Sequence, residues 1–182
     1  MYIYIYFTVN FFLLLFEVDI CKQNECRAFN WATDPEERSK LWQARHNSWF
    51  AMKALHPNRK AISTDVCVPI SNLPEILVQT KKDIDFFKLK TMIVGHVGDG
   101  NFHTFISLDT NNKEEMENYK RYNDKLIRHA LSLDGTCTGE HGIGIGKKKY
   151  LSEQFGKEAC DLMRSIKRTL DPNNILNPAK VL

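Results

Sequence analysis

The sequence predicts an α+β fold in which an antiparallel sheet carries helices on one side. Helical and strand-like segments follow one another in mixed order, and two apolar runs flank the turn GHVGDGNFH of residues 95–103, as in a hairpin. No β-α-β run with a dinucleotide-binding fingerprint is present, which argues against a parallel, doubly wound sheet. The 182 residues suffice for one substantial core.

The helices of the first half begin at recognisable caps. Residues 34–37, Asp-Pro-Glu-Glu, combine an N-cap, a proline at the first helical position and acids in the first turn, which predicts a helix over 35–55. Ser71, followed by Pro74 and Glu75, is expected to cap a second helix.

The second half contains two longer helices around a glycine-rich loop. Residues 112–133 have acids early and bases late, as the helix macrodipole favours. The loop DGTCTGEHGIGIG follows, and a last helix over 152–170 ends at Asp171-Pro172. The remaining tail is expected to be irregular.

Three segments are expected to form the sheet: 61–68, closed by Pro69, then 90–96 and 102–108. The last two would be joined by a tight turn with Asp99-Gly100 at its tip, because this dipeptide is a strong hairpin signal.

This turn would place His96 directly opposite His103. A four-residue loop from Gly98 to Asn101 preserves the same pairing. Opposed residues of an antiparallel pair point to one face with Cβ atoms roughly 4.5–5.5 Å apart, so both imidazoles are able to bind one ion. The alternative is that one histidine is a hydrogen-bonded core residue and the other is exposed.

The glycine-rich loop offers a second group of polar residues. Glu140 would complete a ligand set of two nitrogens and one oxygen that leaves coordination positions open for a substrate. His141, adjacent to it but pointing elsewhere, is a candidate general base. Cys137 is an alternative, softer ligand.

Composition and charge indicate a soluble globular protein that does not bind nucleic acid. Hydrophobic residues make up 43% of the chain, charged residues 26%, and the net charge is only +3. Basic residues are spread out except for Lys147-Lys148-Lys149, which we expect in a solvated loop. Five scattered cysteines without a C-x-x-C pair fit a reducing compartment.

Residues 1–27 are an atypical apolar N-terminal segment. Its start, MYIYIYFTVNFFLLLF, lacks the basic region and cleavage site of a signal peptide, and Thr8 and Asn10 interrupt it. Glu17 and Asp19 end the run before the roughly 18 apolar residues that a spanning helix needs. A buried strand or an ill-defined terminus is favoured over a membrane anchor, and no targeting segment is visible.

Five motifs carry a resemblance to a known family: WQARHNSWFA, STDVCVPIS, GHVGDGNFH, GTCTGEHGIGIGK and LDPNNILNPAKVL. In this order they resemble the C-terminal domain of FAD-linked D-2-hydroxyacid dehydrogenases, especially the mitochondrial enzymes that act on D-lactate. The resemblance covers residues 28–182. It implies the α+β fold of the FAD-linked oxidase C-terminal domain, which supplies a substrate- and metal-binding site beside a separate FAD-binding domain.

The resemblance also implies roles for individual residues. The family's ligands for zinc or manganese match His96, His103 and Glu140. Its catalytic base matches His141, and the arginine that binds the substrate carboxylate matches Arg45. Asn101 would face the substrate or the flavin.

A FAD-binding domain has no room in this chain, so we expect a fragment of a longer protein, inactive alone, with apolar surface exposed. The implied partners are a small 2-hydroxy acid and a FAD-binding domain or longer chain, and the implied location is mitochondrial. Two other functions stay open: a metal-dependent hydrolase, although no H-E-x-x-H signature is present, and a non-catalytic metal-binding remnant.

Overall fold

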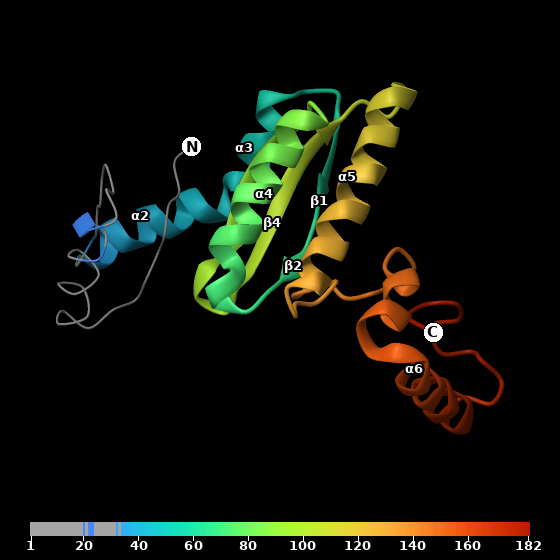
Figure 1. Ribbon diagram of the computed structural model, residues 1–182. Helices are drawn as coiled ribbons and strands as arrows, with labels where there is room; N and C mark the ends of the chain where they lie inside the picture. The colour runs from blue at the N-terminus through green and yellow to red at the C-terminus, as the bar shows by residue number, and fades with distance from the viewer. Residues whose placement is uncertain (1–19, 21, 24–31, 33) are drawn as a thin grey trace. The chain divides into compact units, whose positions relative to one another are not determined.

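The computed structural model describes residues 20, 22, 23, 32 and 34–182 (Figure 1). The strand expected in the first sixteen residues lies outside this part of the chain. The chain divides into two units between residues 51 and 52. No helix of the described residues is both long enough and apolar enough to cross a membrane.

The helix predicted over 35–55 is two helices, α2 (Pro35–His46) and α3 (Ser48–Leu55). The expected N-cap is confirmed, because Oδ1 of Asp34 accepts hydrogen bonds from the backbone N–H groups of Glu36 and Glu37. The expectation of one continuous helix is wrong, because Asn47 ends α2 as its C-cap.

The sheet is antiparallel and is organised around one central strand. β4 (Asn101–Leu108) pairs with β3 (Lys90–His96) on one side. On its other side it pairs with β1 (Lys60–Ser63) and then with β2 (Val66–Cys67).

The strand predicted over 61–68 is interrupted at Thr64 and Asp65, which separate β1 from β2. The register is the same on both sides of the gap, since two residues of β4 also separate the partners of Ser63 and Val66. Asp65 therefore lies beside His103 and on the same face of the sheet.

The two faces of β4 have different neighbours. Phe102, Ile106 and Leu108 point to the hydrophobic core, which also contains buried side chains of α4 (Leu73–Phe86) and α5 (Lys113–Ser132). Both helices lie on this face (Figure 1), which confirms the predicted architecture. By strand alternation, Asn101, His103, Phe105 and Ser107 point to the opposite face.

The helix starts were predicted with mixed success. The helix predicted over 112–133 is confirmed as α5, and Asn112 is its N-cap: its Oδ1 accepts from the backbone N–H of Glu115. Ser71 does not cap α4: it lies in a 3-10 turn, Ile70–Asn72, and Asn72 occupies the N-cap position without a side-chain cap. The Asn72 amide instead donates to the carbonyl of Leu133 at 3.0 Å, which connects the start of α4 to the end of α5.

The β3–β4 turn differs from the predicted one by one residue. A 3-10 turn, Val97–Asp99, is followed by Gly100 with φ +71°, so His96 pairs with Asn101, and Val94 pairs with His103. The expected pairing of His96 with His103 is wrong. Both histidines still share a face, because His103 is two residues from the partner of His96 along β4.

The last helix, α6 (Leu151–Leu170), contains one non-helical residue, Gly156. Its apolar face includes the exposed side chains of Phe155, Leu162, Ile166 and Leu170. Apolar surface was expected from the sequence. The prediction of a solvated lysine loop before α6 fails for Lys147, whose side chain is only 17% exposed and lies near Asp65.

Replacing Gly100 by alanine should destabilise the β3–β4 turn. The new Cβ would clash with the Val68 carbonyl at a positive φ, and Val68 N–H donates to the Gly100 carbonyl at 3.0 Å. We expect a loss of about 1–3 kcal/mol in the free energy of unfolding, measured by urea denaturation. Gly98→Ala is the control, since nothing lies within 4 Å of its added Cβ. Equal stability of the two variants would contradict this account.

Asp124 should stabilise the packing of α5 against the turn before α6 in a pH-dependent manner. Hydrogen bonds from Lys149, Tyr150 and Arg128 outweigh the opposing effect of burial and lower its pKa from 3.8 to about 2. A depressed carboxyl pKa stabilises the fold above the unfolded value, and this contribution is lost as the pH falls.

Asp124→Asn should therefore unfold at a lower temperature than the unchanged chain above about pH 4, and the two unfolding temperatures should converge toward pH 2. The difference in the free energy of unfolding should be about 1 kcal/mol or less, because a third of the Asp124 side chain is exposed. Asp161→Asn is the control, because Asp161 pairs only within α6, with Arg164. A difference for Asp124→Asn that persists at pH 2 would contradict the prediction.

Candidate functional site

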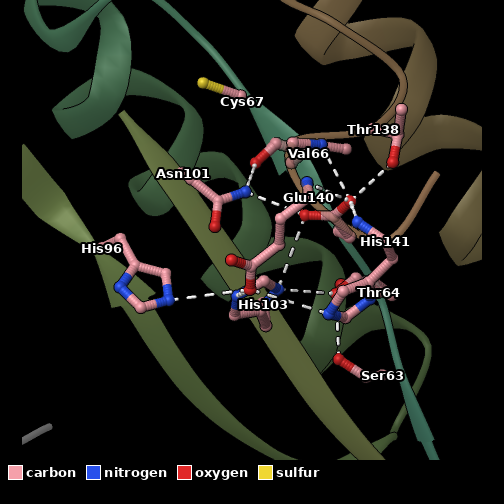
Figure 2. Close-up of polar contacts among 12 residues, drawn as sticks. Ser63, Thr64, Val66, Cys67, His96, Asn101, His103, Thr138, Glu140 and His141 are labelled. Carbon is pink, nitrogen blue, oxygen red and sulfur yellow. Dashed lines mark hydrogen bonds and ion pairs between the residues drawn. The ribbon is translucent and has the colours of Figure 1, made fainter. Parts of the chain in front are cut away.

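The candidate site lies on the face of the sheet opposite α4 and α5. His96 ends β3, and His103 lies within β4. Glu140 and His141 belong to the glycine-rich loop that follows α5. Figure 2 shows the side chains of His96, His103 and Glu140 directed toward one another, although the three residues come from separate segments.

Glu140 is the centre of this cluster. Its Oε1 lies 2.9 Å from Nε2 of His103 and 3.6 Å from Nε2 of His96. One ligand atom from each of the three residues lies within 4.8 Å of the others, a spacing that suits a single cation. The rings of His96 and His103 are nearly perpendicular, at 86°, with centroids 5.8 Å apart.

The protonation of His103 is decided by its surroundings. Nδ1 lies 3.1 Å from the Thr64 carbonyl, so this nitrogen carries the proton and Nε2 presents its lone pair. Burial lowers the pKa of His103, which favours this neutral form. Two acceptors, Nε2 of His103 and the carboxylate of Glu140, then face each other.

A cation between these two acceptors would relieve their repulsion. A metal-binding histidine typically donates its other ring N–H to a carbonyl or carboxylate, as His103 does to Thr64. The donor set, with two imidazole nitrogens and one carboxylate oxygen, fits zinc or manganese.

His141 stacks on His103 with ring centroids 4.9 Å apart and nearly parallel planes. Its Nε2 lies 3.7 Å from Oε1 of Glu140. The expectation that His141 points elsewhere is therefore wrong, because its ring borders the cluster. Its side chain is exposed, so a substrate has access to it.

Asp65 is a residue of the site that the sequence analysis missed. Its side chain is 1% exposed and its Oδ2 accepts four hydrogen bonds from the glycine-rich loop. Burial alone would raise its pKa, but hydrogen bonds from Thr138, His141 and Asn101 and the charge of Lys147 hold it well below its ordinary value. The available signal was that Asp65 is the one charged residue in the strand predicted over 61–68.

A second set of three residues, Asp65, His103 and His141, is also close enough to hold a cation. Two of its three residues already use the facing atoms in hydrogen bonds. Oδ1 of Asp65 accepts from the Asn101 amide at 2.8 Å, and Nδ1 of His103 bonds to Thr64. The set centred on Glu140 is therefore the better metal site.

The other predicted residues lie in different surroundings. Asn101 is buried, its amide nitrogen donates to Asp65 and Val66, and its Oδ1 has no partner among the described residues. Figure 2 shows this nitrogen turned toward Val66. Cys137 is buried and joins neither ligand set of the described residues. Arg45 lies on α2, in the first unit, so its role at the site stays a prediction.

Comparison with known proteins relates this chain to FAD linked oxidases and to enzymes named for D-lactate and glycolate. A probable mitochondrial D-lactate dehydrogenase of Danio rerio is 51% identical over 164 residues, which are 90% of this chain and 33% of that protein. A mitochondrial D-lactate dehydrogenase (cytochrome) of Arabidopsis thaliana is 46% identical, over 85% of this chain and 27% of that protein. The glycolate oxidase subunit GlcD of Bacillus subtilis is 35% identical, over 89% of this chain and 34% of that protein.

The chain spans about a third of the length of these relatives. A solved structure, 4-ethylphenol oxidase from Gulosibacter chungangensis in complex with isoeugenol, shares the fold. The two structures match with a TM-score of 0.57 and 17% sequence identity, and the match covers 93% of this chain and 36% of the oxidase chain. The family model described as "FAD linked oxidases, C-terminal domain" matches residues 16–181. The chain therefore belongs to the FAD linked oxidases, of which it contains the C-terminal domain.

Proposed function

We propose that this chain is the substrate- and metal-binding part of a flavin-dependent D-2-hydroxyacid dehydrogenase, with D-lactate or a similar small hydroxy acid as substrate. The observation that carries the proposal is the convergence of His96, His103 and Glu140 beside a base candidate in a chain of this family. The names of the relatives support D-lactate as the substrate.

His96, His103 and Glu140 would hold the divalent cation, zinc or manganese. The cation would supply positive charge that lowers the pKa of a hydroxyl beside it. The three protein ligands leave positions open, so the site suits a substrate-binding ion rather than a purely structural one. The buried ring of His103 provides the rigid side of the site.

His141 would act as the general base. Its exposed imidazole lies beside Glu140 and would take the proton of the substrate hydroxyl at Nε2. The hydride would leave the carbon that bears this hydroxyl and pass to FAD, so the hydroxy acid loses two electrons and two hydrogens in becoming the 2-oxo acid. The developing positive charge on His141 would be stabilised by the Glu140 carboxylate, 3.7 Å away.

Arg45 and Asn101 are proposed to bind the substrate. The guanidinium of Arg45 suits a two-point contact with the substrate carboxylate. The Asn101 nitrogen is bonded to Asp65 and Val66, and the unpaired Oδ1 is itself buried, so the proposed contact with a substrate would require Oδ1 to become exposed. An acceptor at this position would suit a hydroxyl donor.

A FAD-binding domain, in the same longer protein or as a partner, would bind most of the flavin. The exposed apolar side chains of α6 suit such a contact. The mitochondrial relatives support a mitochondrial location. A hydrolase role and a non-catalytic remnant are less favoured, because the family is one of oxidases.

Removal of one ligand should abolish metal loading. His96→Ala takes away an exposed ligand without touching the core, so the fold should persist while the zinc or manganese content, measured by elemental analysis, drops to background. His129→Ala is the matched control, because His129 also lies near a glutamate, Glu75, but outside the cluster. Equal ion content in His96→Ala and the control would refute the metal site.

Removal of the base should separate catalysis from metal binding. In a flavin-containing long form, His141→Ala should keep its metal and lose about 10²–10⁴-fold in hydroxy acid oxidation. Flavin reduction by D-lactate in a stopped-flow instrument measures this step. Reduction at an unchanged rate would exclude His141 as the base.

A further inference from the structure

The loop that presents Glu140 and His141 is attached to the sheet mainly through one side chain. Oδ2 of Asp65 accepts the backbone N–H groups of three consecutive residues, Gly139, Glu140 and His141, at 2.8, 3.0 and 2.9 Å. It also accepts the hydroxyl of Thr138 at 2.6 Å. Such a run of N–H groups forms an anion-binding concavity, and here the anion belongs to the protein itself.

The position of this carboxylate is fixed independently of the loop. Its Oδ1 accepts the Asn101 amide at 2.8 Å, and the β1–β2 backbone holds it beside His103. Lys147 compensates the buried charge: its Nζ donates to the Asp65 carbonyl at 2.7 Å and lies 3.6 Å from Oδ2. Gly139 permits the close approach, because a Cβ there would clash with the Asn101 side chain.

We propose that Asp65 is the positioning residue of the site, which sets the location of Glu140 and His141 relative to His103 by binding their backbone N–H groups. The inference rests on the proposed function in one respect, namely that the cluster binds a cation. Asp65 connects the sheet, which carries the two histidines, to the loop, which carries the carboxylate ligand and the base. It acts through these residues and contacts no substrate.

The test compares Asp65→Asn with the unchanged chain in two measurements. Titration with Co²⁺, followed by its visible absorption, reports the cation affinity of the cluster. Hydrogen exchange reports the protection of the amides of residues 139–141 and, separately, of β4. Asp83→Asn is the matched control, because Asp83 is also a buried acid, bonded to Lys125 and Gln79 rather than to the site.

We expect Asp65→Asn to weaken Co²⁺ binding about 10–100-fold and to accelerate exchange at residues 139–141, while β4 stays protected and Asp83→Asn binds Co²⁺ normally. Unchanged affinity together with unchanged exchange would overturn the positioning role and leave the metal site standing. If the unchanged chain binds no Co²⁺, the metal proposal fails, and the exchange measurement alone decides the role of Asp65.

A second variant covers the case in which Asp65→Asn unfolds the sheet. Gly139→Ala leaves the carboxylate intact and displaces the loop from it through the clash with Asn101. Weaker Co²⁺ binding with β4 still protected would support the proposal. Normal Co²⁺ binding and normal protection of residues 139–141 in this variant would overturn it.

Discussion

The burial of both faces of β4 is the constraint on which the rest of the structure depends. All eight residues of the strand are buried, and it pairs with each of the other strands. One face contributes Phe102, Ile106 and Leu108 to the core, and the packing of these side chains fixes how the strand is rotated. Because side chains alternate, the same rotation directs His103 to the site.

Burial of polar residues on the second face of β4 is costly unless each one finds partners. The partners lie on the neighbouring segment between β1 and β2. Asn101 donates to Asp65, His103 bonds to the Thr64 carbonyl, and the Thr64 hydroxyl accepts the backbone N–H of Thr104. The remaining acceptor capacity of Asp65 is filled by the loop, so the interior network and the surface loop form one hydrogen-bonded unit.

The fold class and the shared face of His96 and His103 could be predicted because they depend on local pattern. The predicted β3–β4 register was wrong by two positions along β4, because the turn lies one residue earlier than expected. An even shift keeps His96 and His103 on one face. The cap predicted at Ser71 was wrong because the side-chain amide of Asn72 bonds to the carbonyl of Leu133 at the end of α5, a contact that no local pattern encodes.

Asp65 and Lys147 were missed for a related reason. Asp65 bonds to His141 and Lys147, which are more than seventy residues away in the sequence. A short sequence window shows only an acid in a strand and a lysine in a basic run. The role proposed for Arg45 depends on where the first unit lies relative to the site, and the spacing of residues in the sequence does not predict this.

The three candidate ligands differ in how deeply their side chains are buried. The His103 side chain is 3% exposed, whereas those of His96 and Glu140 are 40% and 51% exposed. An ion bound there would be buried on the His103 side and exposed to solvent on the side of His96 and Glu140. Solvent, chelators and competing ions would all approach it from that exposed side. Exchange of the ion would then follow the fluctuations of a carboxylate and a strand end, on timescales far shorter than any opening of the sheet.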